Sequence, residues 1–349
     1  NEDESGRQVF DGVFVHIAGA RRGEFNQRFG QPSLNATASA GSLFPFTDTA
    51  AVDPVTGERG AQLARLERRG TVPKIVAVNT SAEYWRGDAS LVHADVEGAR
   101  DVAPHPQTRL YLFAGCQHTP GTLPPPDADP NTGSRGLQMF NVVDYSPLAR
   151  AVLTNLDRWV GGVEPPPSSV PRLADGTGVP AESTRERFAP IPGVRFPDRI
   201  ERPRRLDFGP ELSRGIVHEL PPKIGAPFAT FVPSVDDDGN DIPGIRAVEL
   251  GAPLATFTGW NPRHPDQGAP GDLMSMLGST LPFAITRAAR EASGDRRPSI
   301  EERYPSRDAY LARAREAAIR LVAERHMLAE DVDAVVERAG RLWDFIVRA

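Results

Sequence analysis

Two short apolar runs, each accompanied by a helical segment, constrain the fold of this 349-residue chain more than any other feature. The runs cover residues 72–80 and 108–115, and both are rich in the β-branched and aromatic residues that favour buried strands. A short charged helix is expected at residues 62–69, and residues 146–161 carry apolar side chains at helical spacing. Because strands that alternate with helices are typical of a parallel sheet, the sequence predicts an α/β fold.

A proline-rich connector at residues 164–169 separates two parts of the chain. Residues 1–165 hold the alternating strands and helices. Residues 166–349 favour short strands and turns up to about residue 260 and helices from about residue 306. We therefore expect a mostly parallel α/β domain, followed by an extension of mixed β and helical structure.

The acidic segment at residues 236–241 is predicted to be a solvent-exposed hairpin turn. It lies between two strand-like segments, residues 229–232 and 244–248. Its pattern of Asp and Asn is similar to a calcium-binding loop, but it lacks the glutamate at the twelfth position and the flanking helices. A turn is therefore favoured over an ion site.

Charge, hydropathy and cysteine content exclude several classes of function. The formal net charge is −6, whereas nucleic-acid-binding proteins normally carry a basic excess on one face. No apolar run approaches the ~18 residues needed to cross a bilayer. The single cysteine, Cys116, allows no intrachain disulfide, and no His-Glu-x-x-His motif is present. We therefore expect no nucleic-acid partner, no membrane span, no metal and no cofactor.

An acidic residue and a histidine follow the two best strands. Glu83 lies shortly after the strand that ends at Thr80, and His118 lies shortly after the strand that ends at Ala114. The carboxyl ends of parallel strands meet at one edge of a sheet, so both side chains are expected at a site there. An acid followed by a histidine in this arrangement matches the second half of a nucleophile, acid and histidine triad, with the histidine as base and the carboxylate holding its tautomer. Asp88 remains an alternative for the acid.

Other polar and aromatic candidates are weaker. His16 also lies near the end of a strand, which is predicted within residues 9–19, and is expected to pack or to support the site. Surface positions are expected for the five remaining histidines, His93, His105, His218, His264 and His326. Trp85 is expected in the core or in the wall of a pocket near Glu83.

The nucleophile is missing from this pattern. A Gly-x-Ser-x-Gly elbow does not occur in the chain, and Gly41-Ser42 and Gly278-Ser279 lack its second half. Cys116 is only two residues from His118 and cannot easily present its sulfur to that ring, so it is expected to be a buried, small apolar residue. The sequence therefore offers an acid and a base without an attacking group.

Several longer motifs, in order along the chain, resemble a bacterial family of α/β-hydrolase-domain proteins that are presumed serine esterases. They are residues 9–12, 16–23, 25–32, 79–91 and 115–118, with further similarity at 257–261 and 302–307. The resemblance implies that residues 1–165 are the C-terminal half of an α/β-hydrolase core and that 166–349 are a family-specific extension. It also implies that the nucleophilic serine and the oxyanion-hole loop lie upstream of residue 1, in a missing segment or a separate chain that this polypeptide needs as a partner.

Two functions remain as hypotheses. In the first, the chain supplies the acid Glu83 and the base His118 of a serine hydrolase that acts on a small-molecule carboxylic ester. In the second, a hydrolase-like half serves as a non-catalytic binding or assembly subunit. A serine oxygen within hydrogen-bond reach of a His118 nitrogen, with the other nitrogen on Glu83, would favour the first.

Overall fold

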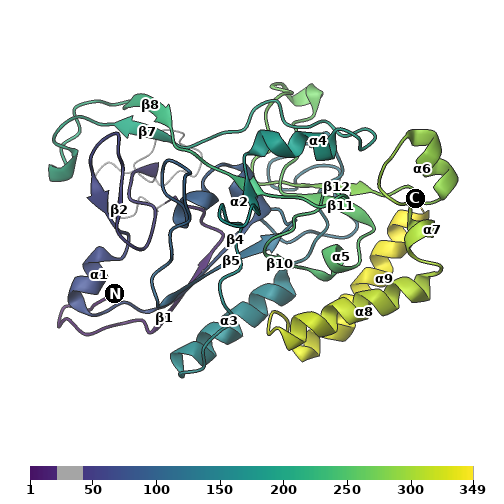
Figure 1. Ribbon diagram of the computed structural model, residues 1–349, viewed down its shortest axis with the longest axis horizontal. Coiled ribbons are helices and arrows are strands. Elements are labelled where there is room, and N and C mark those ends of the chain that lie inside the picture. The colour runs from purple at the N-terminus through teal and green to yellow at the C-terminus, as the bar shows by residue number, and fades with distance from the viewer. Residues whose placement is uncertain (22–41, 349) are drawn as a thin grey trace.

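The computed structural model describes residues 1–21 and 42–348. The motif at residues 25–32 lies outside this range. A parallel sheet with the strand order β1-β4-β5-β10 forms the centre (Figure 1). Its strands are β1 (Gly12–His16), β4 (Lys74–Thr80), β5 (Thr108–Ala114) and β10 (Ile245–Arg246). Together with the helices that pack on it, this sheet confirms the predicted α/β fold.

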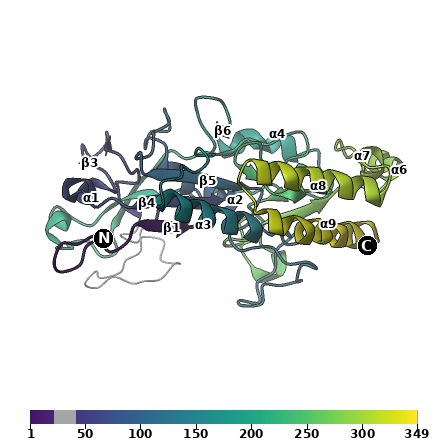
Figure 2. The ribbon, with the colours of Figure 1, turned by 90° about the horizontal axis from the view of Figure 1, so that it is seen from below.

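Three long helices lie on one side of the central sheet (Figure 1). They are α3 (Ser146–Val160), α8 (Arg307–Ala323) and α9 (Val332–Arg348), and they come into view together when the molecule is seen from below (Figure 2). α3 packs on β1 and β4, while α8 and α9 lie side by side and contact α5 (Val248–Gly251). The Ser306 hydroxyl accepts the N–H of Ala309 and caps α8.

The opposite face carries a second apolar cluster, built on short elements. These are α2 (Ser81–Trp85), α4 (Arg185–Phe188) and β12 (Ser279–Pro282), and β12 pairs with β11 (Ala255–Thr258). Four rings pack at its centre, those of Trp85, Phe188, Phe196 and Trp260, with centroids 5.2 to 5.8 Å apart for the contacting pairs. With both faces covered, β4 and β5 are buried, which explains their continuous apolar sequences.

The predicted hairpin around residues 236–241 is correct only at its turn, which an antiparallel bridge between Val235 and Asp241 closes, because the flanking strands do not pair with each other. β9 (Val232–Pro233) pairs with β6 (Gly178–Val179), whereas β10 joins the central sheet beside β5. Asn240 and Asp241 are buried, because the Asn240 side chain bonds the backbone of β11 through Ala255 and Phe257. Residues before and after position 165 thus share one core, and the division there stays a prediction.

The predicted connector at 164–169 lies along β5, where Ser169 exchanges two 2.9 Å backbone hydrogen bonds with Leu110 and Leu112. The remaining helices and strands are β2 (Ala51–Val52), β3 (Arg59–Gly60), α1 (Ala64–Arg69), β7 (Arg204–Asp207), β8 (Lys223–Pro227), α6 (Arg287–Ser293) and α7 (Ile300–Arg303). Short 3₁₀ turns are Ala89–Val92, Ala181–Thr184, Leu212–Arg214, Pro265–Gln267 and Ala329–Asp331. Within the described ranges, no helix is long and apolar enough to cross a membrane.

Candidate active site

Glu83 lies in the first turn of α2, directly after β4. Thr80 caps this helix, and the Glu83 Oε2 atom accepts hydrogen bonds from the Thr80 N–H at 2.8 Å and from the Thr80 hydroxyl at 2.6 Å. The arrangement is a capping box, for which the Thr-x-x-Glu spacing was a signal readable in the sequence. Because the Glu83 side chain is fully buried, these two bonds replace water at Oε2 and leave Oε1 for another partner.

That partner is His118. Its Nδ1 atom lies 2.7 Å from Glu83 Oε1. An ionised carboxylate only accepts hydrogen bonds, so Nδ1 donates and the free lone pair of the neutral ring is on Nε2. The His118 side chain is 28% exposed and lines a pocket of about 400 Å³. The structure therefore brings together the two residues predicted at successive strand ends, in the geometry that a general base requires.

The turn that carries His118 is held on two sides. Its N–H donates to the Met276 carbonyl at 3.1 Å, and its carbonyl accepts the Tyr145 hydroxyl at 2.5 Å. Burial raises the pKa of Tyr145, so this hydroxyl stays a donor at neutral pH. The neighbouring Gln117 side chain accepts the Gly278 N–H at 3.1 Å. These contacts hold the backbone on which the His118 ring is mounted.

Asp88, the alternative acid, faces arginines instead of a histidine. Its carboxylate lies 3.1 Å from Arg86 and 3.3 Å from Arg21, and it is buried. Burial raises the pKa of Asp88, against the opposing effect of the two guanidinium groups. The structure places Asp88 in a cluster of ion pairs next to α2, whereas Glu83 is hydrogen-bonded to His118.

Asp241 is a further buried carboxylate, and it links the two loops of the site. Ser81 donates its hydroxyl to Asp241 Oδ2, which also accepts the Gly115 N–H at 2.8 Å. Ser81 begins the helix of Glu83, and Gly115 begins the turn that leads to His118. Burial raises the pKa of Asp241 to about 6. No sequence signal points to this residue, because its two contacts span 126 and 160 residues.

The other candidates have mixed outcomes. His16 lies beside the site, with its ring centroid 5.9 Å from that of Tyr145, and burial and the nearby His118 lower its pKa. The surface position expected for His93 is wrong: its ring is buried under Phe231, bonds the Tyr84 hydroxyl at 2.8 Å and has a pKa lowered to about 4 by burial. Cys116 is buried, as predicted.

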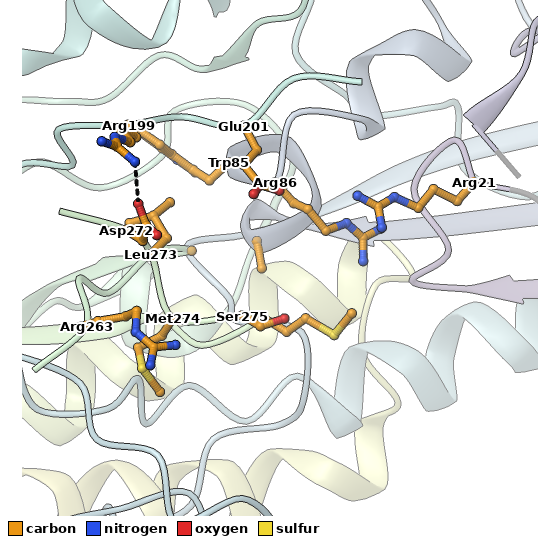
Figure 3. Close-up of a pocket in the computed structure, with 13 residues that line it drawn as sticks. Arg21, Trp85, Arg86, Arg199, Glu201, Arg263, Asp272, Leu273, Met274 and Ser275 are labelled. Carbon is orange, nitrogen blue, oxygen red and sulfur yellow. Dashed lines mark ion pairs between the residues drawn. The ribbon is translucent and has the colours of Figure 1, made fainter. Parts of the chain in front are cut away.

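A second pocket adjoins the pocket of His118. The second has a volume of about 370 Å³ and is lined by Trp85 and other residues of α2 and its surroundings (Figure 3). Residues 274–276 and Arg263 line both pockets. Trp85 thus contributes to the pocket wall as well as to the core, and the paired pockets have room for a small molecule next to the histidine.

We found no metal-binding arrangement in the part of the chain that the structure describes. There, no group of three or more His, Cys, Asp and Glu side chains is placed to hold an ion. In the acidic segment, Asp236 Oδ1 accepts the N–H groups of Asp238 and Asn240, each at 3.0 Å. Its carboxylate is thus used to shape the turn.

A parallel sheet with an acid and a hydrogen-bonded histidine after successive strands is the arrangement of α/β hydrolases. The chain belongs to the family described as "alpha/beta hydrolase domain", which it matches over residues 1–337. No curated protein and no solved structure matches it. The family match confirms the predicted α/β-hydrolase fold and supports a hydrolase.

Proposed function

We propose that Glu83 and His118 are the acid and the general base of a serine hydrolase that cleaves carboxylic esters. The observation that carries this proposal is the buried Glu83 carboxylate 2.7 Å from His118 Nδ1, with Nε2 left for a nucleophile in a pocket of about 400 Å³. Family membership supports the hydrolase part of the proposal.

The chemistry follows from this geometry. His118 Nε2 takes the proton of a serine hydroxyl while the serine oxygen attacks the ester carbonyl. The Glu83 carboxylate holds the ring and stabilises the imidazolium that forms. The imidazolium then protonates the departing alcohol, which leaves an acyl-serine. In the second half of the cycle, His118 deprotonates a water that attacks the acyl group, and returns the proton to the serine.

The proposal assigns the nucleophilic serine to a segment or chain outside these 349 residues. Sheet order supports this assignment, because β1 pairs with β4 on one side and with no described strand on the other. Apolar side chains are exposed near that edge, with Phe10 61% and Val160 44% accessible. A parallel strand beside β1 would end near His16, on the side of the sheet edge that holds His118.

The test is active-site labelling of the full-length protein with a fluorophosphonate, together with turnover of a short-chain 4-nitrophenyl ester. His118→Ala is expected to abolish labelling and to slow turnover by orders of magnitude. The matched control is His218→Ala, because His218 also lies 2.7 Å from a glutamate, Glu211, but in an exposed pair. Labelling that survives in His118→Ala would point to another base, and a wild-type protein that is not labelled would favour the binding-subunit hypothesis.

A serine of the described chain must be tested in parallel. Ser275 lines both pockets and is exposed. Mass spectrometry of the labelled protein locates the modified serine directly. A label on Ser275 that disappears in Ser275→Ala would overturn the assignment of an external nucleophile while leaving the roles of His118 and Glu83 intact.

A further inference from the structure

Arg263 is a cation of the site that has no acidic partner among the described residues. It lines the pocket of His118 and the adjacent pocket. The other arginines of the second pocket are engaged: Arg21 and Arg86 share Asp88, and Arg199 lies 3.6 Å from Asp272. In Figure 3, Arg263 lies at the end of this pocket away from Arg21 and Arg86.

The Arg263 guanidinium is held by backbone carbonyls alone. Nε donates to the Gly268 carbonyl at 3.2 Å and Nη2 donates to the Gln267 carbonyl at 3.0 Å. The backbone at this position is also fixed, because the Arg263 N–H donates to the Asp272 carbonyl at 2.9 Å. The group is therefore oriented before any ligand arrives, which lowers the entropic cost of binding.

These two hydrogen bonds are made by the edge formed by Nε and Nη2, and not by the edge formed by Nη1 and Nη2. An arginine has five N–H donors, and the edge formed by Nη1 and Nη2 matches the two oxygens of a carboxylate. No described residue occupies that edge with a hydrogen bond or an ion pair. Because removing a charge from water is costly, a half-buried cation without a partner favours an anionic ligand.

Few other charges compete in these pockets. In the His118 pocket, the acidic residue is Asp129, whose Oδ1 atom accepts the N–H groups of Asn131 and Thr132 in its own turn. In the second pocket, Glu201 lies beside Arg86, away from Arg263, and the other acidic residue, Asp272, is paired with Arg199 at 3.6 Å (Figure 3). The end of the site at Arg263 is thus open to a negative group.

We propose that Arg263 binds a carboxylate of the substrate, so that the preferred ester carries a second, ionised acid group. This inference rests on the proposed hydrolase function for the ester, and on the geometry of Arg263 for the carboxylate. The carboxylate can belong to the acyl side or to the alcohol side of the ester, since both present the same group to the guanidinium.

Binding to the full chain tests the proposal without any turnover. Monomethyl glutarate, with its carboxylate on the acyl side, and 4-acetoxybutanoate, with its carboxylate on the alcohol side, are titrated by NMR or calorimetry against the neutral dimethyl glutarate. At least one charged ester is expected to bind about tenfold more tightly than the neutral one, as for hydrogen bonds to charged groups. The charged ester that binds more tightly shows whether the carboxylate belongs to the acyl side or to the alcohol side of the substrate. Equal affinity for all three would overturn the proposal.

Variants assign the preference to Arg263. Arg263→Gln is expected to bind charged and neutral esters with affinities within about twofold of each other. Arg263→Lys is expected to keep only part of the preference, because a lysine ammonium is a point charge and lacks the planar pair of N–H groups that matches a carboxylate. Arg199→Gln, which removes a cation already paired with Asp272, is the matched control and is expected to retain the preference. A preference retained in full by both Arg263 variants would refute the assignment.

The two proposals fail separately. His118→Ala removes the proposed base but leaves Arg263 in place, so it is expected to keep the charged-ester preference. A preference without fluorophosphonate labelling of the full-length protein would uphold the carboxylate site and overturn the serine hydrolase. Labelling without any preference for charged esters would uphold the serine hydrolase and overturn the carboxylate site.

Discussion

Replacing Glu83 by glutamine changes one atom in the buried dyad and should invert the tautomer of His118. In the wild-type protein, Oε2 accepts both the N–H and the hydroxyl of Thr80, and Oε1 accepts the His118 Nδ1–H. A glutamine amide has only one oxygen, which must serve either Thr80 or His118.

The contacts decide which orientation the amide takes. Turning the NH₂ group toward Thr80 would leave the buried Thr80 N–H without an acceptor, at a cost of about 1–3 kcal/mol, and would also disturb the bond from the Thr80 hydroxyl. The oxygen therefore stays on Thr80, and the NH₂ group faces His118. Nδ1 must then accept, so the ring proton moves to Nε2, the atom that has to take the proton of the nucleophile. Inverting the tautomer in a serine-protease triad costs about 10⁴ in turnover, and we expect a loss of that order here, about 5 kcal/mol.

The assay is ¹⁵N NMR of the histidine rings in the 349-residue chain, which reports the tautomer without a nucleophile. Wild-type His118 is expected with its proton on Nδ1, and the Glu83→Gln variant with its proton on Nε2. Glu211→Gln is the control, since the exposed His218 beside it can exchange its partner for water. An unchanged His118 tautomer in Glu83→Gln, or full esterase activity of this variant in the full-length protein, would refute the reasoning.

Three further predictions concern stability. Gly259→Ala is expected to destabilise the fold by at least about 2 kcal/mol, because a Cβ at this position would lie 2.3 Å from the Ser81 carbonyl carbon at the start of α2. Thermal melts measure this loss, and an unchanged melting temperature would contradict the prediction. His93, whose pKa falls to about 4 on burial, stays neutral when folded, so its own contribution to stability should drop by about 3 kcal/mol as pH falls from about 6.5 to 4. In urea titrations, the stability difference between wild type and His93→Gln should change by that amount across this pH range. Asp241, whose pKa rises to about 6, keeps its proton longer when folded than when unfolded, so it should add about 3 kcal/mol as pH falls from about 6 to 3.8. Asp241→Asn should lose that contribution, and parallel pH–stability curves for wild type and variant would speak against it.

The pairing of Glu83 with His118 was within reach of sequence reasoning for a simple reason. Each residue comes after a strand with a long apolar run, and β4 and β5 are neighbours that run in parallel. Loops that leave the carboxyl ends of neighbouring parallel strands meet at one edge of the sheet, so local patterns sufficed to place both groups. The capping box of Thr80 and Glu83 is equally local, because its bonds span three residues.

Elements with weak local patterns could not be placed in this way. β9 and β10 have two residues each, too few for an alternating pattern to select a partner, so local patterns favour a hairpin between the nearest strand-like segments. The burial of His93 likewise depends on Tyr84 and Phe231, and Phe231 approaches from a distant part of the chain.

The sequence by itself determined the α/β class, the long helices, and the acid and histidine at successive strand ends, because each depends on periodicity or on contacts between neighbouring elements. Only the tertiary structure decided that Asp88 faces arginines, that Asp241 joins the two loops of the site, and that Arg263 lies beside the His118 pocket without an acidic partner among the described residues. The physical reason is that charge pairing and burial are set by which groups meet in space, and these groups come from segments up to 160 residues apart.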